Sequence, residues 1–198
     1  MHGILTNVTY PSMAGTSGPR DFIELPSQLL EHWASEPEVL KSFAKHYETG
    51  ESIPDKLIGK ILKASKFNQG FINTEYLAAS LLDMDWHTIS YTDPLKDSNE
   101  FEKVSLEKIG LIDEIAPRYR STYFAHIFSG GYSSGYYSYV HAAVLDSDGF
   151  EAFKEAGDVF DPELSTKLRK TIYEKGATEE AMDLFCLLYT SDAADDLL

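Results

Sequence analysis

The chain has 198 residues, of which 43% are hydrophobic and 13% aromatic, so it can bury a core and is not disordered throughout. Its formal net charge is −15, and its basic residues form no Lys/Arg-rich stripe, which argues against a nucleic-acid binder. The sequence contains no run of 18 or more apolar residues, so we expect no membrane span.

Helical periodicity dominates the chain, and the region before residue 22 is the exception, with the composition of an irregular loop. The first helix is predicted over residues 22–33, where apolar residues recur on one face. A second helix is predicted to begin at Pro37 and to stop at Gly50, and a third covers "PDKLIGKILKAS".

Three further helices are predicted along the chain, and aspartates mark the start of two of them. "NTEYLAASLLDMDWHTI" is typical of a longer, more buried helix. Asp97 and Ser98 are both candidate caps for "NEFEKVSLEKIG", and Asp161 is expected to cap "DPELSTKLRKTIYEKG", which closes at Gly176. Strand-like alternation is scarce, so the sequence predicts an all-α, mostly helical chain.

Glu24 lies near the start of the first predicted helix, in "PRDFIELPSQLLEHW". A carboxylate at such a position is commonly a solvated residue that the helix dipole favours, and Arg20 is available as a surface partner four residues earlier. The flanking Ile23 and Leu25 also make burial plausible, and a buried carboxylate needs a cation or a metal. Pattern alone leaves both interpretations open.

The six histidines provide no metal-binding pair. No two of them are spaced i, i+4, so the chain has no HExxH motif and cannot present a two-histidine zinc face by itself. His32, His46, His87 and His141 lie in helical stretches beside apolar residues, and we predict a structural role for each of them.

Residues 126–139, "HIFSGGYSSGYYSY", combine four tyrosines and three glycines with a leading histidine. Tyr132, Tyr136 and Tyr139 are spaced four and three apart, so as core residues they would share one face of a helix. An aromatic surface that binds a sugar or a peptide is a second interpretation.

The glycines of this segment argue against a purely structural core. Gly130, Gly131 and Gly135 would each weaken a helix where packing alone would favour alanine. Glycine there indicates a mobile hinge or the close approach of a ligand. Tyrosine hydroxyls and the His126 imidazole are suitable donors to a developing oxyanion, so a catalytic use of the segment is also open.

Two long motifs in the correct order carry a resemblance to a known family. "HGILTNVTYPSMAGTSGPRDFIELPSQLLEHW" and "FAHIFSGGYSSGYYSYVHAAVLDSDGFEAF" resemble the C-terminal half of the catalytic domain of the thimet oligopeptidase/peptidyl-dipeptidase family of zinc metallopeptidases, in a form similar to bacterial peptidyl-dipeptidases. The resemblance covers residues 1–185. It implies a truncated, zincin-like oligopeptidase domain whose parent enzyme acts on short peptides and releases C-terminal dipeptides, although the endopeptidase branch shares almost all these residues.

The resemblance implies one zinc ion as cofactor, and Glu24 matches the third zinc ligand. In the family, an HEFGH-type helix with two zinc histidines and a general-base glutamate continues directly into a segment like "MHGIL". The resemblance therefore implies that Met1 is an internal methionine, and that both histidine ligands and the N-terminal part of the enzyme are absent from this chain. We accordingly expect the isolated chain to be inactive.

The resemblance also assigns roles within residues 126–139. His126 matches a histidine that holds the substrate backbone and the transition state, and Tyr139 matches the tyrosine that donates to the oxyanion. Tyr132 matches a tyrosine that hydrogen-bonds substrate or intermediate. The expected substrate-binding residues are His126, Gly130, Gly131, Tyr132, Tyr136 and Tyr139.

Residues 186–198, "CLLYTSDAADDLL", break the helical pattern of the preceding "GATEEAMDLF". They resemble a tail that recurs on unrelated predicted proteins from translated sequencing adapter. We therefore expect this segment to be non-native.

A second hypothesis comes from a different functional class. The chain could be a non-catalytic helical module whose aromatic loop grips a peptide or a partner protein. Apolar helix faces that another half of a cleft would have covered would then bind a partner or aggregate.

Overall fold

The structure is a computed structural model that describes residues 1–189. These residues form helices joined by loops, and the one β-type pairing among them is an isolated antiparallel bridge between Lys45 and Ser52. The predicted all-α class is therefore confirmed. Over the same residues, every helix is too short or too polar to cross a membrane.

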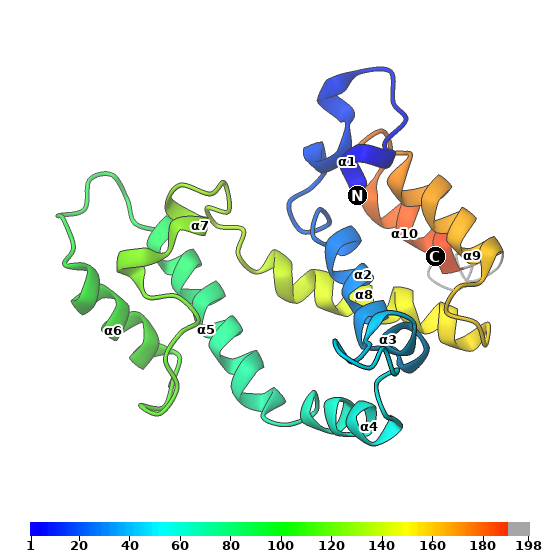
Figure 1. The fold of residues 1–198 in the computed structure, drawn as a ribbon. Coiled ribbons are helices and arrows are strands. Elements are labelled where there is room, and N and C mark those ends of the chain that lie inside the picture. Colours follow the sequence, from blue (N-terminus) through cyan, green and yellow to red (C-terminus); the bar gives the residue numbers. More distant parts are fainter. Residues whose placement is uncertain (190–198) are drawn as a thin grey trace. The chain divides into compact units, whose positions relative to one another are not determined.

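The helices follow one another along the chain as coloured from blue to red in Figure 1. In order, the elements are α1 (His2–Leu5), the 3-10 turns η1 (Pro11–Met13) and η2 (Gly15–Ser17), α2 (Leu25–Ser35), α3 (Pro37–Phe43), α4 (Asp55–Ala64), α5 (Gln69–His87), α6 (Ser98–Lys108), the 3-10 turn η3 (Ser121–Tyr123), α7 (Ala125–Phe128), α8 (Ser138–Glu155), α9 (Pro162–Leu168), the π-helical turn η4 (Arg169–Tyr173) and α10 (Ala181–Tyr189).

The chain divides into two compact units. The first contains residues 1–62 and the described part of residues 141–198, and the second contains residues 63–140. The chain passes from the first unit to the second within α4 and returns within α8.

The core of the first unit is built from α2, α8, α9, η4 and α10. Leu29 of α2 is fully buried in the same apolar cluster as Phe150 and Phe153 of α8. Trp33 meets both phenylalanine rings edge-on, at centroid distances of 4.6 and 5.0 Å, and its indole N–H donates to the carbonyl of Val159 at 2.7 Å. Burial of a side chain such as Leu29 contributes about 1.5–3 kcal/mol, so this cluster holds α2 in place.

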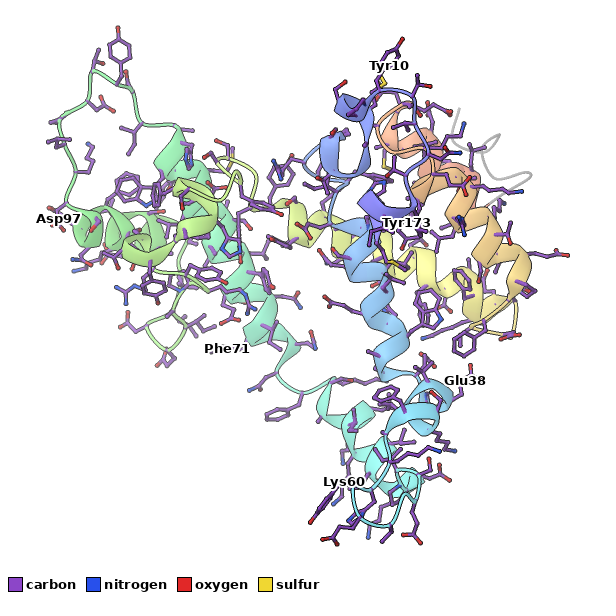
Figure 2. All side chains as sticks on the ribbon, turned by 45° about the horizontal axis from the view of Figure 1, so that its top comes forward. Tyr10, Glu38, Lys60, Phe71, Asp97 and Tyr173 are labelled. Atoms are coloured by element: carbon purple, nitrogen blue, oxygen red, sulfur yellow. The ribbon has the colours of Figure 1, made fainter. Side chains whose placement is uncertain are left out.

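The segment before α2 packs on the connection between η4 and α10. The ring of His2 meets that of Tyr173 edge-on at 5.9 Å (Figure 2 labels Tyr173). The backbone N–H of Ala177 donates to the carbonyl of Met13 at 2.8 Å. Gly176 has a φ of +58°, and a Cβ at this position would lie 2.4 Å from the Met13 carbonyl oxygen. The predicted irregular segment is therefore ordered by tertiary contacts and includes α1, η1 and η2.

The helix predicted from Pro37 to Gly50 is wrong in its second half, because α3 ends at Phe43. The chain then folds back on itself, and the N–H of Ile53 donates to the carbonyl of Ala44 at 2.8 Å. Gly50 has a φ of +71°, which suits a tight turn rather than a continuing helix.

The second unit gathers α5, α6, α7 and the start of α8 around its own apolar cluster. Phe124, Ile127 and Tyr136 are at most 2% exposed, and they pack with Ala79 of α5. Figure 1 shows α6 lying beside α5, and residues of the two helices are in contact.

Both aspartates predicted to cap helices do so. Asp97, labelled at the start of α6 in Figure 2, accepts hydrogen bonds from the N–H groups of Asn99 and Glu100, both at 3.0 Å. Asp161 accepts from the N–H of Leu164 at 2.8 Å. These two helix starts are therefore confirmed.

The segment expected to be non-native, residues 186–198, falls partly within the described chain. Residues 186–189 continue α10, and Leu188 is fully buried in the same cluster as Phe185. The expected break in helical phase is therefore wrong for these four residues, because α10 continues through them and Leu188 packs into the core. Residues 190–198 lie outside the described residues, and the foreign origin of the segment stays a prediction.

Candidate functional site

Glu24 is the N-cap residue of α2, in the first unit. Its carbonyl accepts the N–H of Gln28 at 2.9 Å, which closes the first turn of the helix. The side chain is partly buried between the buried Ile23 and Leu25, and the hydroxyl of Ser27 donates to its Oε2 at 2.9 Å. The carboxylate is thus neither fully solvated nor fully enclosed.

The helix that carries Glu24 is tied to α8 through residues one and two turns further on. The amide of Gln28 donates to Oδ2 of Asp146 at 3.1 Å, and Nε2 of His32 lies 2.7 Å from Oδ1 of the same carboxylate. Asp146 is buried, and the His32 ring stacks on Phe150 at 4.9 Å. His32 has the structural role predicted for it, and these contacts fix the helix that presents Glu24.

The tyrosine-rich segment is a series of turns between two helices rather than one helix. α7 ends at Phe128 and α8 begins at Ser138, so the shared helical face of the three tyrosines does not form. The N–H of Tyr132 instead donates to the carbonyl of His126 at 2.9 Å, which folds the chain back over α7. We call residues 129–137 the tyrosine loop.

The two predicted glycines shape the start of the tyrosine loop. A Cβ on Gly130 would lie 2.9 Å from Cα of His126 and 3.0 Å from its carbonyl oxygen. At Gly130 the backbone of the loop therefore passes close to the backbone of α7. Gly131 has a φ of +81°, a conformation that other residues adopt only with strain. Both glycines therefore allow the chain to turn back onto α7.

This fold brings His126, Tyr132 and Tyr139 together in the second unit. The His126 ring meets the two tyrosine rings edge-on, at centroid distances of 5.8 Å for Tyr132 and 6.3 Å for Tyr139. The two tyrosine rings stack on each other at 5.4 Å. All three side chains are partly exposed, so three polar hydrogen-bonding groups border one accessible surface.

Tyr136 packs into the cluster beneath these rings. Its side chain is 2% exposed, and its ring lies 5.2 Å from that of Tyr139 and 5.7 Å from that of His126. Burial, followed by the neighbouring phenols of Tyr76 and Tyr119, raises the pKa of Tyr136, so this hydroxyl stays protonated near neutral pH. Its predicted contact with a substrate stays a prediction.

Several residues that complete this cluster were not predicted from the sequence. The Tyr119 ring lies 5.0 Å from that of His126, and the guanidinium of Arg118 lies 4.4 Å above the ring of Tyr76. These partners come from α5 and from the loop before η3, so no local spacing pointed to them.

A buried carboxylate on α5 was also missed, and it contacts the tyrosine loop directly. Asp83 is fully buried and accepts hydrogen bonds from the N–H groups of Ser134 and Tyr136, at 3.0 and 2.9 Å. Nδ1 of His87 lies 2.8 Å from its Oδ1. The i, i+4 spacing of Asp83 and His87 is the one signal that the sequence offered for this contact.

The predicted site residues thus fall in two groups. The second unit brings together His126, Gly130, Gly131, Tyr132, Tyr136 and Tyr139, whereas Glu24 belongs to the first unit. Across residues 1–189, no three His, Cys, Asp or Glu side chains are grouped so as to hold a metal ion.

Comparison with known proteins identifies the family. The profile of Peptidase family M3 matches residues 1–196, nearly the whole chain. The chain belongs to peptidase family M3. The resemblance that the two long motifs carry is therefore confirmed.

Relatives of this M3 chain are longer proteins. It is 41% identical over 186 residues to the dipeptidyl carboxypeptidase of Escherichia coli K12, covering 93% of this chain and 27% of that protein. It is 37% identical over 191 residues to oligopeptidase A of the same organism, with the same two coverages. The mitochondrial intermediate peptidase of Sclerotinia sclerotiorum is 34% identical over 146 residues, 73% of this chain and 18% of that protein. The M3 chain thus spans 27% of the length of the two Escherichia coli relatives.

The described residues of the M3 chain fit one ligand of a zinc ion but not a complete site. A partly buried carboxylate such as that of Glu24 is a donor that zinc accepts. A catalytic zinc ion takes three protein ligands and keeps a fourth position for water or substrate. Residues 1–189 present no such group of ligands.

Proposed function

We propose that this chain is part of a zinc-dependent oligopeptidase, to which it contributes one zinc ligand and the substrate-contacting aromatic surface. Membership of the M3 family supports the reaction class. The observation that carries the proposal is the packing of His126, Tyr132 and Tyr139 around one partly exposed surface. Neutral donors placed in this way are what the oxyanion of peptide hydrolysis requires.

The proposed chemistry divides between the metal and the residues of this chain. A bound zinc ion would polarise the scissile carbonyl and lower the pKa of a bound water. Glu24 would hold the ion through its carboxylate, with further ligands from outside the described residues. His126 and Tyr139 would donate an N–H and an O–H to the developing oxyanion, each contributing about 3 kcal/mol when oriented toward it. Tyr132 would donate to the substrate or to the intermediate.

The proposed substrates are short peptides, from which the enzyme would release C-terminal dipeptides. The name of the 41%-identical relative, dipeptidyl carboxypeptidase, supports this mode of cleavage. The 37%-identical relative is an oligopeptidase, so the products distinguish the two modes. Mass spectrometry of the fragments from a short peptide would show a dipeptide and a shortened peptide for the proposed mode, and internal fragments for endopeptidase action.

A chimaera tests the proposed roles. This chain would replace the matching 27% of the Escherichia coli dipeptidyl carboxypeptidase. We expect zinc-dependent peptide hydrolysis. Glu24→Gln should abolish both zinc retention and hydrolysis, and Tyr139→Phe should retain zinc and lower kcat on the order of a hundredfold. The matched control is Tyr137→Phe, because this tyrosine lies two residues before Tyr139, at the end of the tyrosine loop, and is 43% exposed. A folded chimaera that keeps zinc and activity after Glu24→Gln would overturn the proposal.

For the isolated chain we propose that neither tight zinc binding nor hydrolysis occurs. One carboxylate cannot supply the three protein ligands of a catalytic zinc site. Stoichiometric zinc by atomic absorption, together with hydrolysis that Glu24→Gln abolishes, would contradict this expectation.

The alternative, a non-catalytic binding module, has one observation in its favour. Leu77, Leu81 and Met84 follow one another at helical spacing along α5, and each is between 41% and 49% exposed. An apolar stripe of this kind suits a partner surface. A chimaera that folds and binds peptide but never hydrolyses it would favour this alternative.

A further inference from the structure

We propose that Asp83, supported by His87, is the positioning residue of the tyrosine loop. It acts by holding the loop backbone in the conformation that brings Tyr132 and Tyr139 together. The role rests on the proposed function, because these tyrosines are the groups assigned there to substrate and oxyanion. The fixing of the loop itself is a separate physical claim, and it can be tested without any peptide.

Both carboxylate oxygens of Asp83 accept hydrogen bonds from the tyrosine loop, and one of them also contacts His87. Oδ1 accepts the N–H of Ser134 at 3.0 Å, and Oδ2 accepts the N–H of Tyr136 at 2.9 Å. Nδ1 of His87 lies 2.8 Å from Oδ1. With no exposed surface on Asp83, water cannot take the place of these donors.

The two amides that Asp83 binds lie in the sequence between Tyr132 and Tyr139, whose rings stack on each other. Ser134 has a φ of +55°, a left-handed conformation that is uncommon for a residue with a side chain. The neighbouring turns join this point to both tyrosines: the N–H of Gly135 donates to the carbonyl of Tyr132 at 2.8 Å, and the N–H of Tyr139 donates to that of Tyr136 at 3.3 Å. Fixing Ser134 and Tyr136 therefore fixes the path from one ring to the other.

His87 is the last residue of α5, and it contacts Asp83 a second time. Its Nδ1 also lies 2.9 Å from the backbone carbonyl of Asp83, so the ring is held by two oxygens of the same residue. Its ring lies 6.0 Å from that of Phe128, which ends α7 just before the loop. The pair therefore contacts the segment both before and within the tyrosine loop.

Asparagine is the informative replacement at position 83. It preserves the size of the side chain, but one of its two terminal atoms becomes an NH₂ donor. That donor would face a backbone N–H or the His87 imidazole, where an acceptor is needed. One buried backbone donor then loses its partner, and the loop opens more often.

Hydrogen exchange of the 198-residue chain, followed by NMR, tests this claim. We expect Asp83→Asn to speed exchange at the Ser134 and Tyr136 amides on the order of ten- to a hundredfold. The matched control is Asp85→Asn on the same helix. Asp85 accepts from Ser105 at 2.8 Å and from Lys108 at 3.0 Å, and its bonds go to α6. The control variant should leave the two loop amides unchanged.

A spectroscopic signature separates positioning from general loss of stability. The ring resonances of Tyr132 and Tyr139, shifted by their mutual stacking, should move in Asp83→Asn, while that of the fully exposed Tyr91 stays. His87→Phe leaves the carboxylate in place and should speed exchange at the same amides by a smaller factor, about threefold or more. This second variant decides the question if Asp83→Asn does not fold.

Several results would overturn the role of Asp83. They are an absence of protection at Ser134 and Tyr136 in the unsubstituted chain, unchanged exchange in both variants, or an equal effect of Asp85→Asn. In the chimaera, Asp83→Asn should lower kcat/KM and leave the zinc content unchanged. A chimaera that never hydrolyses peptide, together with the expected exchange changes, would reject the proposed function and uphold the fixing of the loop.

Discussion

Replacement of Asp146 by alanine should destabilise the first unit, because this buried carboxylate connects α2 to α8. The carboxylate has 7% of its surface exposed and accepts from His32 at 2.7 Å and from Gln28 at 3.1 Å. Asp146→Ala removes the acceptor for both donors, which connect α2 to α8. The loss of these two bonds should also loosen α2, whose first residue follows Glu24.

Two magnitudes set the expected loss. A hydrogen bond to a charged group contributes about 1.5–3 kcal/mol, and a buried donor left without a partner costs about 1–3 kcal/mol. Because the His32 side chain is 30% exposed, solvent screens part of this interaction. We therefore expect Asp146→Ala to lower the free energy of unfolding by about 2–3 kcal/mol.

Urea unfolding followed by tryptophan fluorescence measures this loss. The chain has two tryptophans, and a Trp86→Phe background leaves Trp33 as the reporter of the first unit. The control is Asp148→Ala, an exposed carboxylate on the same helix, which should change the free energy of unfolding by less than about 0.5 kcal/mol. A double-mutant cycle with His32→Ala should give a coupling of about 1–2 kcal/mol. Strict additivity, or a loss no larger than that of Asp148→Ala, would show that Asp146 does not stabilise the contact between α2 and α8.

Three further predictions concern glycines and pH. Gly149→Ala in α8 should stabilise the chain by about 0.5–1 kcal/mol in thermal unfolding, because the new methyl group meets Leu29 only at ordinary contact distance and alanine favours the helix. Gly130→Ala should destabilise the second unit, since its Cβ would lie 2.9 Å from Cα of His126; circular dichroism melting showing no loss would contradict this. Burial lowers the pKa of His2 below 6.5, so the folded chain binds fewer protons than the unfolded chain, and stability should fall as the pH drops below about 6.5. Urea midpoints at neutral and mildly acidic pH should show a smaller fall for His2→Phe.

The sequence predicted those helices whose signals are local. Asp97 and Asp161 cap their helices as expected because a capping bond spans only two or three residues. The helix from Pro37 was extended too far, because its end depends on a bond from Ile53 back to Ala44 that periodicity does not reveal.

At the candidate site, contacts between residues far apart in the sequence are even harder to predict from local patterns. The family motifs pointed to His126, Tyr132 and Tyr139, and the structure does bring these three together. The sequence does not indicate the contact of Asp83 with the loop, because the amides that Asp83 binds lie 51 and 53 residues after it in the chain. Such a contact leaves no trace in local spacing.

The position of Asp83 and His87 in the last two turns of α5 links the fraying of a helix end to the order of a distant loop. Helix termini open first in native proteins, so α5 and the loop should open as one cooperative unit. A peptide that immobilises the tyrosines should then slow exchange at the Met84 and Trp86 amides as well. Exchange at these two amides would then show whether the peptide is bound, although both amides lie in the helix that supports the loop and not on the surface that contacts the peptide.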